Sequence, residues 1–118
     1  KYLGLSVTNT YNFDMKLSNG KKIDVKTKAT SVAPKLNYEC SISAYNTKQI
    51  CDYYVFCRVS KNLNTGWILG YMPKKEYMAH AVKLSKGDFD PSNNFTVRAD
   101  CYNMEIGHLL DIDTLKSA

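Results

Sequence analysis

Apolar and polar residues alternate along two neighbouring stretches near the N-terminus. In residues 11–17 every second side chain is apolar. In residues 21–29 Ile23 and Val25 share one face, and the other face carries four charged side chains: Lys22, Asp24, Lys26 and Lys28. This two-residue period is typical of half-buried β-strands. Asn19-Gly20 lies between the two stretches and favours a tight turn, because these residue types adopt positive φ angles at little cost. The pattern therefore predicts a β-hairpin.

Aromatic and β-branched residues indicate further strands along the chain. Residues 52–60 have this composition and predict a central strand. Residues 67–72 follow after a short polar turn, so the two stretches predict a second hairpin. The other stretches with strand character are residues 2–8, 35–44 and part of 95–106.

Two short helices are also expected. Pro73 opens the sequence PKKEYMAHAV and suits the first position of a helix, because the first turn needs no amide donor there. Asp111 or Asp113 can cap a terminal helix over residues 114–117. Residues 84–94 read as a polar connection.

The order of these elements predicts an α+β fold, with a mixed β-sheet built from hairpins and one or two short flanking helices. The length of 118 residues fits a single domain. No run of 18 apolar residues occurs, so no transmembrane helix is expected. The net charge of +5 and the pI near 9.0 favour a polyanionic partner such as nucleic acid, although an ordinary basic surface has the same charge.

Cysteine and histidine give weaker candidates for a functional site. An even number of cysteines allows disulfides, but apolar, strand-like contexts without a CxxC pair favour free buried thiols in a cytoplasmic protein. A zinc site that adds His80 or His108 to these cysteines lacks a recognisable ligand spacing. The four cysteines are separated by 11, 6 and 44 residues: Cys40, Cys51, Cys57 and Cys101.

The first hairpin brings two carboxylates together. A two-residue turn would place residues whose numbers sum to about 39 opposite each other, so Asp24 is expected to face Met15, with Asp14 one step along. Two neighbouring carboxylates repel each other, so either one is protonated or a cation lies between them. Mg²⁺ suits this position, since it binds one or two carboxylates, often a backbone carbonyl, and several waters.

Lys26 follows Asp24 by two positions and therefore points to the same face of the strand. A divalent ion can polarise a phosphate and acidify a water, and a lysine beside it can orient that water or neutralise charge in the transition state. The same residues also fit a solvated hairpin face, where ion pairs contribute little to stability. Spacing alone leaves both interpretations open.

The sequence around these residues resembles the PD-(D/E)xK nuclease superfamily. In that family an Asp ends one strand, a hairpin follows, and the next strand carries Asp or Glu, one hydrophobic residue and Lys. The matching residues are Asp14, a spacer of nine residues, and Asp24-Val25-Lys26 followed by Thr27-Lys28, with Phe13 in place of the family's proline. The order of the later elements is similar to that of phage and restriction-type members.

The resemblance implies a restriction-endonuclease-like core and the activity of a metal-dependent DNA endonuclease. Asp14, Asp24 and Lys26 are then the catalytic residues. The implied cofactor is Mg²⁺ or Mn²⁺, held by Asp14, Asp24 and Val25. DNA is the expected partner, and a homodimer is expected because a nuclease of this size often needs a second copy to cut both strands.

Further site residues follow from the same resemblance. Some exonuclease members carry Gln-x-x-x-Tyr after the lysine, and Gln49 and Tyr53 fit this string, which makes Gln49 a candidate site residue. Lys16, Lys22 and Lys28 surround the motif and are candidates for phosphate contacts. They fit solvated hairpin charges equally well.

One family feature has no counterpart in this sequence. Many members carry an acidic residue on a helix before the first motif strand, and no acidic residue precedes Asp14 here. Either a segment before Lys1 supplies it, so that the 118 residues lack an N-terminal helix or a targeting domain, or the site lacks this ligand. The second case favours an alternative function, a non-catalytic nucleic-acid-binding module of the same fold.

Overall fold

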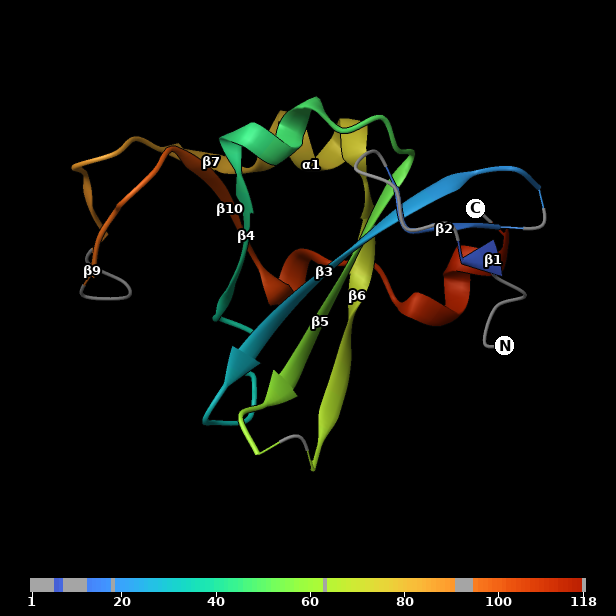
Figure 1. The fold of residues 1–118 in the computed structure, drawn as a ribbon, viewed down its shortest axis with the longest axis horizontal. Helices are drawn as coiled ribbons and strands as arrows, with labels where there is room; N and C mark the ends of the chain where they lie inside the picture. The colour runs from blue at the N-terminus through green and yellow to red at the C-terminus, as the bar shows by residue number, and fades with distance from the viewer. Residues whose placement is uncertain (1–5, 8–12, 18, 63, 91–94, 118) are drawn as a thin grey trace.

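The strand β3 (Lys22–Thr30) lies at the centre of a five-stranded sheet (Figure 1). The computed structural model describes residues 6–7, 13–17, 19–62, 64–90 and 95–117. The sheet has the order β1 (Ser6–Val7), β2 (Met15–Lys16), β3, β5 (Tyr53–Ser60) and β6 (Gly66–Pro73). A second sheet has the order β4 (Glu39–Ser43), β10 (Cys101–Glu105) and β7 (Val82–Leu84), and β8 (Phe89–Asp90) pairs with β9 (Phe95–Thr96). The helical segments are α1 (Lys74–His80), η2 (Ala44–Lys48), η3 (Ile106–His108) and η4 (Ile112–Ser117).

β3 pairs antiparallel with β2 on one side and parallel with β5 on the other. The first predicted hairpin is therefore present as β2–β3. The strand predicted over residues 52–60 is β5, which lies inside the sheet between β3 and β6. The antiparallel pairing of β5 with β6 confirms the second hairpin. Parallel neighbours need a long crossover, and residues 31–52 provide it through β4 and η2.

The register of the first hairpin differs by one residue from the sequence prediction. Met15 pairs with Ile23, not with Asp24. The amide of Asp14, next to Met15, also donates to the Ile23 carbonyl, at 2.9 Å. The prediction that Asp24 faces Met15 is therefore wrong, and Asp14 lies just before the paired residues of β2.

The turn explains this shift. The amide of Leu17 donates to the Lys21 carbonyl at 2.8 Å, so three residues lie between these two positions where a two-residue turn was expected. Gly20, the last of the three, has a φ of +87°, which a glycine adopts without steric cost. Three-residue hairpin loops commonly place such a residue at this point.

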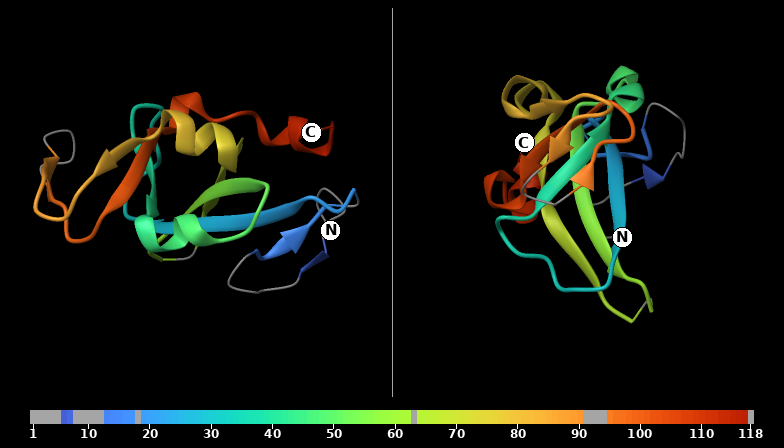
Figure 2. Two further views of the ribbon diagram at one scale, coloured as in Figure 1. Left: turned by 90° about the horizontal axis from the view of Figure 1, so that it is seen from above. Right: turned by 90° about the vertical axis from the view of Figure 1, so that its left-hand side faces the viewer.

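Different elements cover the two faces of the five-stranded sheet (Figure 2). Along β5, Tyr54 and Phe56 point to the face that packs against β4, α1 and β10. Tyr53 and Val55 point to the opposite face, where Leu115 of η4 is fully buried against them. This alternation is the ordinary side-chain geometry of a strand that is buried on both faces.

The start of the helix differs from the sequence prediction. Pro73 is the last residue of β6 and pairs with Tyr53, and α1 begins at the next residue. Pro73 has an extended ψ of 135°, because its pairing in the sheet holds it out of the helix. At the C-terminus the predicted helix is the 3-10 segment η4, and the Asp111 carboxylate accepts a hydrogen bond from the Asp113 amide at 2.9 Å.

Other boundaries shift where strand pairing overrides local pattern. The polar connection predicted over residues 84–94 contains the end of β7 and all of β8, since pairing with β10 and β9 makes strands of them. The strand predicted over residues 35–44 is confined to β4, and the strand character of residues 95–106 divides between β9 and β10. Within residues 2–8 only β1 is described, and the rest of that prediction lies outside the described residues.

The structure confirms an α+β fold with a mixed sheet and one short α-helix among its described elements. None of the helices in the described ranges has the length and apolar character needed to cross a membrane.

Candidate active site

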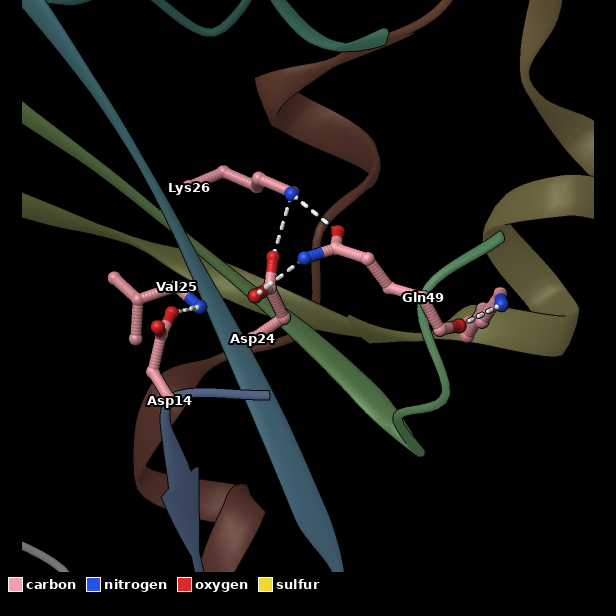
Figure 3. Close-up of polar contacts among 6 residues, drawn as sticks. Asp14, Asp24, Val25, Lys26 and Gln49 are labelled. Atoms are coloured by element: carbon pink, nitrogen blue, oxygen red, sulfur yellow. Dashed lines mark hydrogen bonds and ion pairs between the residues drawn. The ribbon is translucent and has the colours of Figure 1, made fainter. Parts of the chain in front are cut away.

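Three side chains from two segments meet near the start of β3 (Figure 3). The Nζ atom of Lys26 lies 2.6 Å from Oδ2 of Asp24 and donates to Oε1 of Gln49, also at 2.6 Å. Nε2 of Gln49 donates in turn to Oδ1 of Asp24 at 3.1 Å. The exposed fractions are 4% for the Asp24 side chain and 17% for the Lys26 side chain. The charged face of β3 is therefore a buried polar cluster at this point and not a solvated surface.

Strand alternation positions Asp24 and Lys26 on the same face. Ile23 and Val25 point to the opposite face, toward the cluster that Leu115 covers. Lys26 Nζ also lies 5.8 Å from the ring centroid of Tyr54 on the neighbouring strand, a cation–π distance. The local sequence thus directs both charged side chains into the space between the sheet and the elements that cover it.

Gln49 reaches this cluster from the crossover. η2 ends just before it, and its own amide donates to the Asn46 carbonyl at 3.1 Å. Lys74, the first residue of α1, donates from Nζ to the Gln49 carbonyl. The Lys74 amide donates to the Asp52 carbonyl at 2.9 Å. The end of η2 and the start of α1 therefore fix the backbone that carries the Gln49 side chain.

Asp14 stands directly before β2, at the edge of β3. Its Oδ2 atom accepts a hydrogen bond from the Val25 amide at 2.8 Å, in the place where a longer β2 would continue the ladder. The amide and carbonyl of one strand residue point to the same edge, so the Val25 carbonyl is directed to the side where Asp14 lies. The family pattern has this Asp at the end of a strand, whereas here it precedes one.

The pKa of the Asp24 carboxyl is raised. Burial is the largest cause, since a charged carboxylate loses its hydration inside the protein. The Lys26 ammonium lowers this pKa by hydrogen bonding and by charge without cancelling the effect of burial. Asp14 raises the pKa further, so the two carboxyl groups lie close enough to interact.

Two carboxylates and a backbone carbonyl at this point of β3 are groups that could hold a divalent metal ion. Oδ2 of Asp24 is buried 2.6 Å from the Lys26 ammonium, and a carboxylate oxygen has more than one lone pair, so this atom can also accept a second cation. Asp14, Asp24 and the Val25 carbonyl are oxygen donors, which Mg²⁺ and Mn²⁺ prefer. Among the residues that the structure describes, no third Asp, Glu, His or Cys side chain completes a larger ligand group with them.

The lysines predicted to contact phosphate lie in two places. Lys16 and Lys22 pair across the β2–β3 hairpin, and their Nζ atoms lie 5.6 and 5.4 Å from the ring centroid of Phe13. Lys28 is exposed further along β3 and shares a cleft with Lys26. Lys28 therefore lies in line with the candidate site, while Lys16 and Lys22 belong to the hairpin end of the strand.

Sequence reasoning did not single out Lys74 or Tyr54 as neighbours of the site. Tyr54 lies in register with Asp24 across the parallel pair, so it could be inferred once that pairing was known. No sequence signal indicates Lys74, because its approach depends on how α1 follows β6. Tyr53, the second residue of the Gln-x-x-x-Tyr string, is buried on the opposite face against Tyr71.

The cysteines and histidines do not form a site. All four cysteines are free thiols, as expected, but only Cys40 of the four is buried, and the other three are partly exposed. His80 is exposed and lies 3.5 Å from Glu76 on the same helix, while His108 is also exposed. Within the described ranges no cysteine–histidine group that could hold a metal is present.

Comparison of this chain with known protein families and with curated proteins finds no match.

Proposed function

We propose that this protein is a metal-dependent nuclease that hydrolyses phosphodiester bonds in DNA. The observation that carries the proposal is the ion pair between Asp24 and Lys26, buried on β3 and joined to Gln49. Asp14 interacts with the same carboxyl group from the edge of the strand. Burying charges costs free energy, and buried charged groups with shifted pKa values gather at functional sites.

The residues have separate tasks in this mechanism. Asp14, Asp24 and the Val25 carbonyl would hold the ion, Mg²⁺ or Mn²⁺. When bound, such an ion supplies Lewis acidity that polarises a phosphate group and acidifies a water. In the hydrolysis, water would attack phosphorus and lose a proton, the bond to the leaving sugar oxygen would break, and that oxygen would take up a proton, so that one water is added across the bond. The Lys26 ammonium would orient the water and neutralise negative charge that develops on the phosphate.

Gln49 acts through the other residues. Its amide oxygen accepts from Lys26 and its amide nitrogen donates to Asp24, so one side chain fixes the separation of cation and carboxylate. Preorganised charges of this kind need no rearrangement during the reaction. We further propose that the five-stranded sheet is a restriction-endonuclease-like core. The location of the Asp24-Val25-Lys26 motif on the second strand of a hairpin supports this.

Cleavage of plasmid and linear DNA in Mg²⁺ or Mn²⁺ tests the function. Asp24→Asn and Lys26→Gln are each expected to lower the cleavage rate by about 100-fold or more, as removal of a general acid–base or electrostatic group does. Lys83→Gln, a matched loss of one exposed lysine on β7, should cut at the rate of the unmodified protein. Metal-independent DNA binding without any cleavage would overturn the proposal in favour of a non-catalytic nucleic-acid-binding module.

A further inference from the structure

Arg58 on β5 is a buried cation that no carboxylate neutralises among the described residues. Its residue exposure is 6%. One guanidinium nitrogen, Nη2, donates to the backbone carbonyl of Glu39 at 3.0 Å, and the group lies 5.4 Å from the ring centroid of Tyr38. A guanidinium has five N–H donors, and buried charges are normally paired. This arrangement leaves a positive charge that an external anion can satisfy.

The guanidinium opens into a cleft between β3, β5 and β4. The cleft has a volume of about 330 Å³ and is continuous through shared residues with a smaller hollow of about 150 Å³. Lys28 lines both hollows and lies in register with Arg58 across the parallel pair. Lys26 of the candidate active site lines the larger one. The cleft therefore leads from Arg58 and Lys28 directly to the proposed catalytic lysine.

The charge of this cleft is predominantly positive. Three cations line its two hollows, and Glu39 is the acidic residue among their described lining residues. Burial raises the pKa of the Cys40 thiol to about 12, while the charges of Arg58 and then Lys28 act to lower it. Both cations therefore exert their field at the cleft wall that Cys40 forms.

We propose that Arg58 and Lys28 bind a backbone phosphate of a single nucleic-acid strand that runs along this cleft to Lys26. The choice of nucleic acid as ligand rests on the proposed nuclease function, whereas the anion site rests on Arg58 itself. Lys26 and Lys28 are two residues apart on one strand, about 6.6 Å, which is comparable with the spacing of neighbouring phosphates along a single strand. The volume corresponds to a small-ligand pocket, so one extended strand fits where a double helix does not.

Binding of a fluorescent oligothymidylate, measured by anisotropy in EDTA, tests the site without any catalysis. Lys28→Gln should weaken binding about fivefold or more and reduce the slope of log K against log salt by about 0.7, the loss of one phosphate contact to a single strand. Arg58→Lys keeps the charge but not the planar fork, and it should also weaken binding. Lys83→Gln is the matched control and should bind as the unmodified protein does.

The proposal would be overturned if Lys28→Gln and Lys83→Gln bound the oligothymidylate equally well. It would also be overturned if a DNA duplex of the same length competed for binding better than the single strand. Lys28 is exposed, so its variant folds even if a change at buried Arg58 does not. The two proposals fail separately. If Lys28→Gln binds the oligonucleotide normally while the unmodified protein cleaves DNA, the cleft proposal is wrong and the nuclease proposal stands. If Lys28→Gln weakens binding but the unmodified protein does not cleave DNA in Mg²⁺ or Mn²⁺, the nuclease proposal is wrong and the anion site stands.

Discussion

Gln49 donates from its side-chain amide to the Asp24 carboxylate across 3.1 Å, although 25 positions separate the two residues in the sequence. The same amide group accepts from Lys26. A neutral side chain from the crossover thus connects both charged partners.

Replacing Gln49 should therefore change the pH dependence of cleavage. In Gln49→Met the Asp24 carboxylate loses a donor that stabilises its charged form, so its pKa, already raised by burial, rises further. The acidic limb of the rate profile should move to higher pH, and the rate at its optimum should fall about 10-fold, as for other residues that orient metal ligands. Lys48→Ala, an exposed neighbour, is the control. An unshifted acidic limb would show that Gln49 has only a packing role.

The Asp24→Asn variant should be more stable than the unmodified protein at neutral pH. Because the pKa of Asp24 is raised in the folded state, its ionisation destabilises the fold, and stability falls as pH rises through that raised pKa. Asn carries no such charge. At pH values above the raised pKa, the Tm of Asp24→Asn should therefore exceed that of the unmodified protein by about 2–5 °C. This gain should shrink as the pH falls toward 3.8, the ordinary pKa of the carboxyl group. Thermal melts between pH 4 and about 8 measure this, without metal. A constant difference across the range would contradict it.

Removing the cation should have the opposite effect. Lys26→Met leaves Asp24 buried without its ammonium partner and should lower the free energy of unfolding by about 1–3 kcal/mol at neutral pH. The loss should shrink in acid, where Asp24 is protonated, and the double variant Asp24→Asn/Lys26→Met should recover most of the stability. Denaturant unfolding of the two single variants and the double variant measures the coupling. Additive effects would mean that the two side chains do not interact.

Divalent metal should stabilise the protein through the two carboxylates. Mn²⁺ or Mg²⁺ at about 100 times its dissociation constant should add about 2.7 kcal/mol to the free energy of unfolding. Asp14→Asn and Asp24→Asn should each abolish most of the resulting rise in Tm. Glu105→Gln, which removes an exposed carboxylate on β10, should leave the rise intact. Loss of the rise only in the control variant would place the metal elsewhere.

Local pattern predicted the parts of the site that lie on one strand. Asp24 and Lys26 share a face because alternation is fixed by strand geometry. Their burial could not be predicted, since a polar pattern shows the chemical type of a face and not what covers it. The proximity of Gln49 to Asp24 and the burial of Arg58 against the Glu39 carbonyl depend on how β4 and η2 return to the sheet. The one-residue error in register came from the turn at Gly20, where two-residue and three-residue loops both fit the sequence.

The parallel pairing of β3 with β5 also bears on how this protein acquires its proposed activity. Such pairing joins segments that are distant in sequence, so the chain loses loop entropy before the contacts form, and folds rich in such contacts form slowly. The hairpin that carries Asp14, Asp24 and Lys26 can form locally, but Gln49 joins them only after the crossover closes. Under these assignments, a nascent chain would carry the acidic and basic groups of a nuclease before it could cut, and the onset of cleavage would report the completion of folding.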